Sequence, residues 1–203
     1  MAKTSKVRQR NNILNIIYFF LFNIALISAL TYSTNLQISS IYKDVYRAEI
    51  TGFLNVVKKQ STDIIQKEKL SKKEKQEELI RYLASISHKG FYFWANDNKG
   101  VAVYHIDPSK IGSFQSSYIR HISKSERGVI FEMTDNINPS TGQRQDKING
   151  YFILKPWGWV IGHGRYIDSS GIELKAFLFA MKIGIPLILF QLIIIFFYRR
   201  RTY

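Results

Sequence analysis

Two long apolar runs near the ends of the chain constrain its fold more than any other feature. Residues 13–32 carry no formal charge over twenty positions, and residues 177–198 carry one lysine near their start. About twenty apolar residues in a helix cross the hydrocarbon core of a bilayer. A secretory signal peptide is the alternative for the first run, but its apolar region would be shorter. A buried core helix is the alternative for the second run, but the three arginines that follow favour a membrane span.

Basic residues beside both runs predict how the chain crosses the membrane. Four Lys and Arg residues precede the first run, and Arg199–Arg201 follow the second. Basic flanks stay on the cytoplasmic side, so we expect the central segment to lie outside the cytoplasm. The predicted layout is a cytoplasmic N-terminus at 1–12, transmembrane helices at 13–32 and 176–198, an extracytoplasmic domain at 33–175, and a cytoplasmic tail at 199–203.

The distribution of charge argues against a nucleic-acid partner. The net charge is +14, but residues 33–175 hold 21 basic and 15 acidic side chains, and most of the remaining basic residues flank the apolar runs. A mildly basic, solvated surface accounts for this balance better than a nucleic-acid patch does. The chain has no cysteine, which excludes a disulfide framework and a thiolate metal site.

The first part of the central segment predicts two helices. Apolar residues recur at helical spacing from Ile38 to Val57, so the helix of the first span is expected to continue beyond the membrane. Its apolar stripe has to pack on the sheet, on a second copy of the same helix, or on both. The sequence Ser71-Lys72-Lys73-Glu74 is a capping box, and Leu79 and Leu83 belong to the apolar stripe of the helix that follows it.

Five strands with short connections are predicted after these helices. Phe91–Asn96 and Val101–His105 are rich in aromatic and β-branched residues, and a turn that ends in Gly100 joins them. Three further strands are expected near 129–133, 146–155 and 159–167, with a short helix near 116–124 and a turn at 125–128 before them. This order predicts an α+β fold in which a long N-terminal helix and a second helix precede a five-stranded antiparallel sheet, flanked by two transmembrane helices.

Alternation in the last strand sorts its side chains into two faces. One face holds Val160, Gly162, Gly164 and Tyr166. The other face holds Trp159, Ile161, His163 and Arg165. Paired glycines remove side chains where another element approaches closely, so the glycine face is expected to pack on the long first helix. The opposite face would then offer an aromatic ring, an imidazole and a guanidinium to a small anionic or zwitterionic ligand.

Two stretches of the central segment resemble the single Cache sensory domain of bacterial chemoreceptors, histidine kinases and cyclic-di-nucleotide enzymes. The first is GFYFWANDNKGVAVYHIDPSKIG at 90–112, with an aromatic strand, an Asp/Gly turn and a valine strand that ends in a histidine. The second is DKINGYFILKPWGWVIGHGRYID at 146–168, with a lysine strand, a Trp-Gly-Trp turn and a closing Tyr-Ile-Asp. The resemblance covers about residues 33–172. It implies a PAS-like sheet that binds small organic acids, amino acids or related metabolites outside the cell.

Nine residues are candidates for contact with a ligand. They are aromatic or cationic side chains of the strands, the usual makeup of a small-molecule pocket with a few cations. They are Tyr92, Trp94, Tyr104, His105, Lys147, Tyr151, Trp159, His163 and Arg165. Lys147 stands at the position of the family's strand lysine and is expected to pair with a carboxylate. His105 either contacts the ligand or caps its loop. Arg165 either binds a carboxylate in a bidentate manner or lies in solvent, and His121 is expected at the surface.

The sequence carries no recognisable catalytic or metal-binding pattern. Its four histidines lack metal-ligand spacing, and there is no nucleophile elbow, P-loop or paired-carboxylate motif. We therefore expect no enzyme activity, no metal and no cofactor.

These features predict a sensor anchored in a bacterial inner or plasma membrane, with residues 33–175 periplasmic or extracellular. It would bind a small extracellular ligand and pass a conformational signal across the membrane. Only Arg199–Tyr203 follow the second span, too few for an output domain, so either a separate chemoreceptor or kinase is the signalling partner or the chain is a truncated receptor. A homodimer through the long first helix is the expected frame. The alternative function is a membrane-anchored assembly factor that uses the domain as a protein-binding surface.

Overall fold

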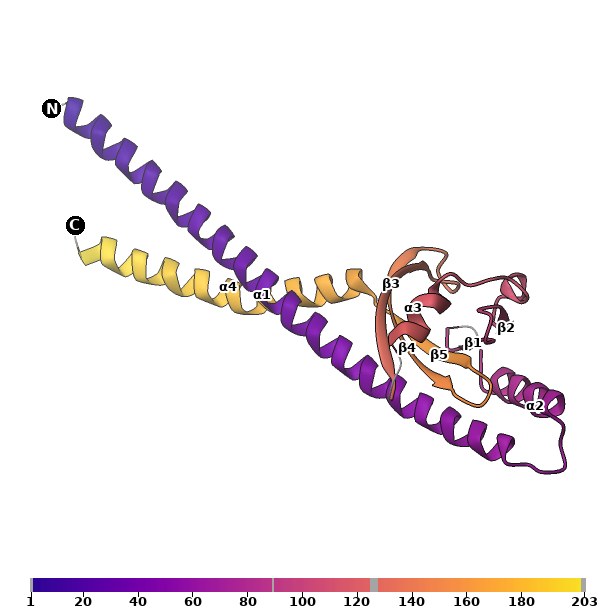
Figure 1. Cartoon of the computed structure of the whole chain (residues 1–203). Helices are drawn as coiled ribbons and strands as arrows, with labels where there is room; N and C mark the ends of the chain where they lie inside the picture. Colours follow the sequence, from indigo (N-terminus) through magenta and orange to yellow (C-terminus); the bar gives the residue numbers. More distant parts are fainter. Residues whose placement is uncertain (1, 89, 125–127, 202–203) are drawn as a thin grey trace. The chain divides into compact units, whose positions relative to one another are not determined.

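Figure 1 shows the computed structural model of the chain. The structure describes the backbone of residues 2–88, 90–124 and 128–201, and the side chains of 14–88, 90–118, 121–122, 128–197 and 200. It divides into two compact units, one of residues 42–168 and the other of the two terminal segments. Residues 125–127 of the predicted turn and the basic side chains of the predicted cytoplasmic N-terminus lie outside the described part.

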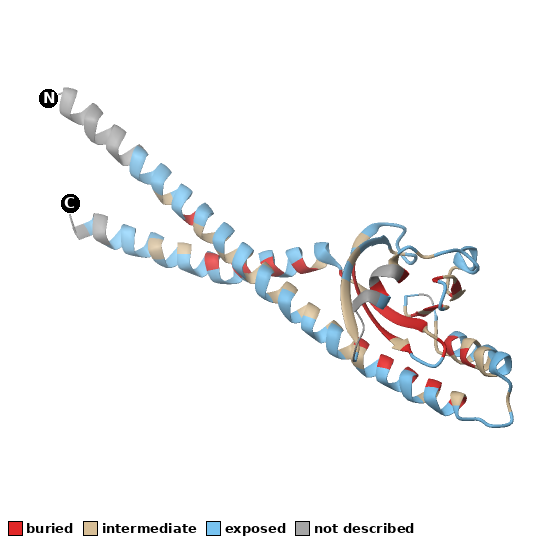
Figure 2. Ribbon diagram, in the orientation of Figure 1, coloured by how far each residue is buried: buried red, intermediate tan, exposed pale blue. Residues whose placement is uncertain are grey.

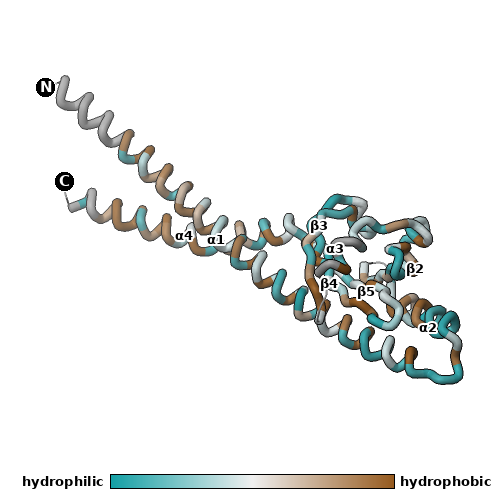
Figure 3. Tube along the Cα trace, in the orientation of Figure 1, coloured by the Kyte–Doolittle hydropathy of each residue, from teal (hydrophilic) through white to brown (hydrophobic). Residues whose placement is uncertain are grey.

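The terminal unit is built from two long helices. Helix α1 runs over Ala2–Ile65, of which the residues up to Ile41 belong to this unit, and α4 runs over Ser169–Arg201. Both helices contain windows long and apolar enough to cross a membrane, with mean hydropathies of 2.0 and 2.3. Figure 3 shows these apolar stretches in brown. Most of their large apolar side chains are exposed, an arrangement suited to lipid rather than water.

Helices α1 and α4 contact each other within this unit. The Asn23 side chain is buried, and its Nδ2 donates to the Gln191 side-chain oxygen at 3.1 Å and to the Phe19 carbonyl at 2.8 Å. A Cβ added at Gly184 would lie 2.9 Å from the Ile27 side chain, so the two helices approach closely there. Small residues and amide hydrogen bonds of this kind hold helices together in apolar surroundings.

The other unit begins with the rest of α1 and with α2, Lys72–Ser85. The predicted capping box is confirmed, because Ser71 Oγ accepts from the Glu74 N–H at 3.3 Å and Glu74 accepts from the Ser71 N–H at 2.7 Å. Leu79 and Leu83 form the buried stripe of α2, as the spacing predicted. The hydrogen bonds that Ser71 donates keep the pKa of the Glu74 carboxyl below its usual value.

The sheet of this unit has five strands and confirms the predicted α+β fold. They are β1 (Phe93–Asn96), β2 (Ala102–Tyr104), β3 (Ile130–Ile137), β4 (Arg144–Leu154) and β5 (Trp159–Tyr166). They pair in the order β2-β1-β5-β4-β3, antiparallel throughout. A short 3₁₀ helix, η1 (Pro108–Lys110), and α3 (Ser117–Lys124) lie between β2 and β3. The first strand begins two residues later than predicted, and the third extends four residues further.

Helices cover the two faces of the sheet (Figure 1). On one face, Ile50 and Leu54 of α1 pack directly over Gly150 of β4, where any Cβ would overlap the Ile50 side chain. On the other face, Tyr118 of α3 joins Tyr151 and Val160 in a second buried cluster. Figure 2 shows the central strands β4 and β5 as largely buried between these layers.

The predicted assignment of the β5 faces is wrong. Gly162 lies under the indole ring of Trp94, and Gly164 lies beside Lys147 and Asn149, so the glycine face points away from α1. The opposite face, with His163 and Arg165, points toward α1: the His163 ring centre lies 5.7 Å from that of Phe53, and Arg165 Nε lies 3.6 Å from a Glu49 oxygen. Alternation in the sequence determines which side chains share a face of the strand, but it does not determine which layer covers that face. The glycine that lies against α1 is Gly150 on β4.

Candidate functional site

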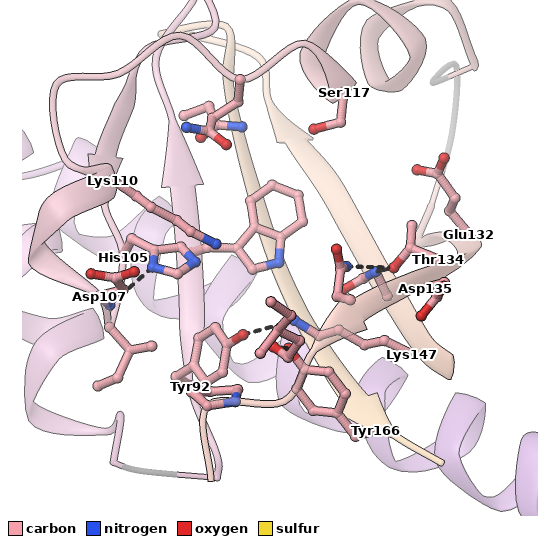
Figure 4. Close-up of a pocket in the computed structure, with 18 of the residues that line it drawn as sticks. Tyr92, His105, Asp107, Lys110, Ser117, Glu132, Thr134, Asp135, Lys147 and Tyr166 are labelled. Atoms are coloured by element: carbon pink, nitrogen blue, oxygen red, sulfur yellow. Dashed lines mark hydrogen bonds between the residues drawn. The ribbon is translucent and has the colours of Figure 1, made fainter. Parts of the chain in front are cut away.

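A cavity of about 650 Å³ opens on the face of the sheet that points away from α1. Its walls come from β1, β3, β4 and β5, from the segment after β2, and from α3. Figure 4 shows His105, Asp107 and Lys110 on one side of it, Glu132, Thr134 and Asp135 on the other, and Tyr92, Lys147 and Tyr166 between them. Gly162 and Gly164 of β5 leave room for the side chains that line the cavity. A Cβ at Gly162 would overlap Trp94, and a Cβ at Gly164 would overlap Asn149 and Lys147. A space of this size accommodates a small molecule.

Lys147 is the buried cation of this cavity. It is 5% exposed, and its Nζ donates to the Tyr92 hydroxyl at 2.9 Å. The same nitrogen lies 4.7 Å from the centre of the Tyr92 ring and 5.0 Å from that of Tyr166, so two aromatic faces flank it. Among the described residues no carboxylate pairs with it. Burial, assisted by the nearby charge of Lys110, lowers the pKa of Lys147 to about 7.

Tyr92 and His105 place two neutral donors near that cation. Burial raises the pKa of Tyr92, so its hydroxyl keeps its proton. His105 Nδ1 accepts from the Asp107 N–H at 2.9 Å, which leaves the ring proton on Nε2. Burial lowers the pKa of His105 to about 4, with smaller contributions from Lys110 and Lys147. His105 therefore caps its loop and also lines the cavity, and its contact with a ligand stays a prediction.

His121 and Glu132 form a second polar group on the cavity wall. His121 Nε2 lies 3.0 Å from a Glu132 oxygen, and both side chains are largely buried. The imidazole packs 4.1 Å from the ring centre of Tyr151 and 5.4 Å from that of Trp94. The prediction that His121 lies at the surface is wrong. Its position three residues after the buried Tyr118 places it on the same face of α3, which is the sequence signal that would have found it.

Amide and hydroxyl groups complete the wall. Asn149 Nδ2 donates to Thr134 Oγ1 at 2.8 Å, which links β4 to β3 beside Lys147. Tyr166, near the end of β5, lines the cavity and donates to the Ile137 carbonyl at 2.9 Å. Neither Thr134 nor Tyr166 was among the predicted site residues, although Tyr166 stands directly opposite Lys147 in the register of β4 and β5.

The structure brings four of the nine predicted site residues into the cavity wall. They are Tyr92, Trp94, His105 and Lys147. Tyr151 is fully buried behind His121, while Tyr104 and Trp159 are buried outside the cavity wall. His163 and Arg165 lie on the other face of the sheet. His163 is fully buried among Phe53, Phe91 and Phe93, and its Nδ1 lies 2.8 Å from the Tyr92 carbonyl oxygen.

The charge of His163 follows from this position. Burial lowers the pKa of His163 to about 4, so the imidazole is neutral near pH 7 and donates its Nδ1 proton to the Tyr92 carbonyl. This links the backbone of a cavity residue to a ring that contacts α1.

Among the described residues, no three His, Asp or Glu side chains gather closely enough to hold a metal ion.

Three solved structures align with most of this chain. The crystal structure of a methyl-accepting chemotaxis protein from Vibrio parahaemolyticus RIMD 2210633 aligns with a TM-score of 0.51 and 18% identity, covering 68% of this chain and 97% of that one. A periplasmic sensor domain of a chemotaxis protein aligns with a TM-score of 0.49 and 20% identity, and the alignment covers 68% of this chain and 97% of that domain. A Cache chemosensory domain described for carboxylic acid recognition aligns with a TM-score of 0.45 and 20% identity, and the alignment covers 62% of this chain and 98% of that domain. The Vibrio protein shares the fold of this chain.

The sequence itself matches a family model over most of its length. The model is dCache_2, described as a Cache domain, and it matches residues 11–181. The match includes the part of α1 that packs on the sheet, all five strands and every residue of the cavity wall. The chain therefore belongs to the Cache family of extracytoplasmic sensory domains.

Proposed function

We propose that this protein is a membrane-anchored sensor that binds a small carboxylate or zwitterion in the cavity at Lys147 and passes a conformational signal across the membrane. The observation that carries the proposal is the buried Lys147 side chain, which faces the cavity and has no carboxylate partner among the described residues. Burying an unpaired cation is unfavourable, and an anionic ligand supplies the missing charge.

The residues around Lys147 support a carboxylate at that point. The Tyr92 hydroxyl and the Nε2–H of His105 are neutral donors for its oxygens, and the exposed Lys110 adds a second positive charge at the rim. Trp94 supplies an aromatic wall for the body of the ligand. The Glu132–His121 pair on the far side suits an ammonium or hydroxyl group of the same molecule. In this proposal Tyr104, Tyr151, Trp159, His163 and Arg165 support the site without touching the ligand.

The route of the signal follows from chain continuity. Tyr166 lines the cavity at the end of β5, and α4 begins at Ser169, three residues later. A ligand that contacts Tyr166 in one arrangement of the strand end and not in another shifts the equilibrium between them by its difference in affinity. We propose that residues 33–175 lie outside the cytoplasm between spans at 13–32 and 176–198, so that this shift reaches the second span.

A thermal-shift screen of the full chain in detergent tests the proposal. The probes are acetate, pyruvate, succinate and a set of amino acids. A ligand at about 100 times its Kd adds about 2.7 kcal/mol to the free energy of unfolding, which raises Tm by several degrees. We expect stabilisation of the wild type by at least one of these probes.

Two lysine variants locate the effect. Lys147→Met removes the buried cation and is expected to abolish stabilisation by the probe. Lys155→Met removes the exposed lysine that directly follows this strand and is expected to leave the stabilisation intact. Stabilisation that survives Lys147→Met would place the ligand elsewhere. Capture of a protein partner with no response to any small molecule would favour the assembly role instead.

A further inference from the structure

We propose that anion binding in this cavity is linked to the uptake of one proton by Lys147, so that the sensor responds to its ligand and to the external pH together. The proposal rests on the proposed function and concerns the regulation of the same site. Its basis is the arrangement of the groups around the lysine nitrogen.

The immediate partners of Lys147 are neutral. Its Nζ donates to the Tyr92 hydroxyl, and the rings of Tyr92 and Tyr166 flank it. Asn149, two residues along β4, is engaged with Thr134. Phenol and amide groups do not compensate a full positive charge when water is displaced, so burial favours the neutral amine. The lowering of the Lys147 pKa to about 7 agrees with this geometry.

The charged groups that face the cavity from the other elements do not compensate Lys147. From η1, Lys110 adds a second positive charge that opposes protonation of Lys147. From the loop after β2, His105 is neutral near pH 7, because burial lowers its pKa to about 4. The Asp107 side chain of the same loop accepts from the Ser109 hydroxyl at 2.7 Å and from the Ser109 N–H at 3.0 Å.

The carboxylates of β3 are also engaged. Asp135 pairs with Arg144 of β4 at 3.1 Å, near solvent. Glu132 lies 3.0 Å from His121 of α3. Each acidic side chain on the cavity wall therefore has a partner other than Lys147, so a ligand carboxylate is the counter-charge that the site can gain.

The direction of the linkage follows from these contacts. An anion beside Nζ favours the ammonium form and raises the pKa of Lys147, so binding at a pH between the pKa values of the empty and the occupied site draws up to one proton from solvent. Below about pH 7 the empty site is already protonated, and the affinity for the anion is at its maximum. Above that pH the affinity falls, by up to about tenfold for each pH unit, until the pKa of the occupied site is reached.

Trace acetylation of the full chain with acetic anhydride measures the protonation of Lys147 without requiring a ligand. Only the neutral amine reacts, so mass spectrometry of the Lys147 peptide across about pH 5.5–11.5 follows its deprotonation, with the exposed Lys155 as internal reference. We expect half-maximal labelling of Lys147 near pH 7, and an upward shift of at least one pH unit when succinate or acetate is present at saturation. Half-maximal labelling near the ordinary lysine value of about 10.4 would overturn the proposal.

Stabilisation by the same carboxylate at pH 6 and at pH 9 separates this proposal from the proposed function. The wild type is expected to lose at least tenfold in affinity between these values. Lys147→Arg keeps its charge throughout the range and is expected to bind with no such loss. Equal affinity of the wild type at both values would remove the proton linkage and leave the sensor function intact. No stabilisation at pH 6 by any carboxylate would remove both.

Discussion

Two buried side chains, Lys147 and His163, and the half-buried His105 have pKa values displaced from their ordinary ranges. Burial lowers the pKa of Lys147 to about 7 and those of His105 and His163 to about 4. The charge of Lys147 adds to the effect on both histidines. The interior around the cavity therefore disfavours positive charge at three neighbouring positions, and an anion that enters it relieves this condition at Lys147.

Acid sensitivity of the empty protein follows from the two histidines. Their folded-state pKa values of about 4 lie below the unfolded value of about 6.5. The unfolded chain then binds more protons between pH 6.5 and 4, so the free energy of unfolding falls as pH drops through this window. For the buried His163 each displaced pKa unit corresponds to about 1.4 kcal/mol, and for the half-buried His105 to less, because solvent screens its charge.

His163→Asn tests this origin of acid sensitivity. The asparagine amide can still donate to the Tyr92 carbonyl, but it does not titrate. We expect the variant to be less stable at pH 7, by about 1–3 kcal/mol, because the ring contacts with Phe91 and Phe93 are lost. Its decline between pH 6.5 and 4.5, measured by denaturant unfolding of the full chain in detergent, should be shallower than that of the wild type. Parallel declines would contradict a role for His163.

At the scale of elements, two glycines mark opposite faces of the sheet. Gly150 of β4 lies under α1, and Gly162 of β5 lies under the Trp94 indole on the cavity face. In both places a Cβ would overlap a neighbouring side chain, so each glycine allows a close approach that alanine forbids. The two residues are therefore a matched pair for separating packing on α1 from the shape of the cavity.

Gly150→Ala and Gly162→Ala are both expected to destabilise the protein, by about 1–3 kcal/mol, because they overpack the core. Only Gly162→Ala should displace Trp94, and with it change tryptophan fluorescence and the affinity for the carboxylate found in the thermal-shift screen. Gly150→Ala should leave both at wild-type values. An equal loss of affinity in the two variants would mean that the cavity senses general destabilisation rather than the position of Trp94.

Local signals in the sequence predicted the elements well, and non-local contacts were the source of the errors. The capping box at Ser71, the hairpin turn at Gly100 and the strand alternation depend on residues close in sequence, and the structure confirms them. Which face of β5 meets α1 depends on residues more than a hundred positions apart, such as Glu49 and Arg165. The glycine pair indicated a close approach correctly, but the approaching groups come from the neighbouring strands: Trp94 at Gly162, and Lys147 and Asn149 at Gly164.

The candidate site was predicted in part for the same reason. Lys147 and Tyr92 stood out as a cation and an aromatic in a strand pattern shared with a known family. The pairing of His121 with Glu132 joins a helix to a strand over a separation of 11 residues, and neither residue is unusual within its own element. Tyr166 was assigned to the helix-packed face together with the glycines, so the inversion of that face removed it from the predicted site.

At the scale of the whole molecule, an exposed apolar strip on α1 bears on assembly. Ile50, Leu54 and Val57 are buried toward the sheet, whereas Val45 and Val56 are 54% and 60% exposed. Positions 45, 52 and 56 recur at intervals of seven and four, the spacing of one helix face that packs on another helix, and Gly52 has open space around it. The exposed face at positions 45, 52 and 56 supports the expected dimer through α1. In that dimer Ile50, Leu54 and Val57 pack on the sheet, and the exposed face packs on α1 of a second copy.

Cysteine cross-linking in membranes tests that dimer without background, because the chain has no native cysteine. Val45→Cys and Val56→Cys are each expected to give a disulfide-linked dimer under mild oxidation, since the same residue of two copies meets across a twofold helix pair. Leu54→Cys, fully buried against the sheet, is the matched control and should stay monomeric. Equal cross-linking at all three positions would indicate random collision. Cross-linking at Leu54 alone would require α1 to leave the sheet, which would contradict the packing that forms this domain.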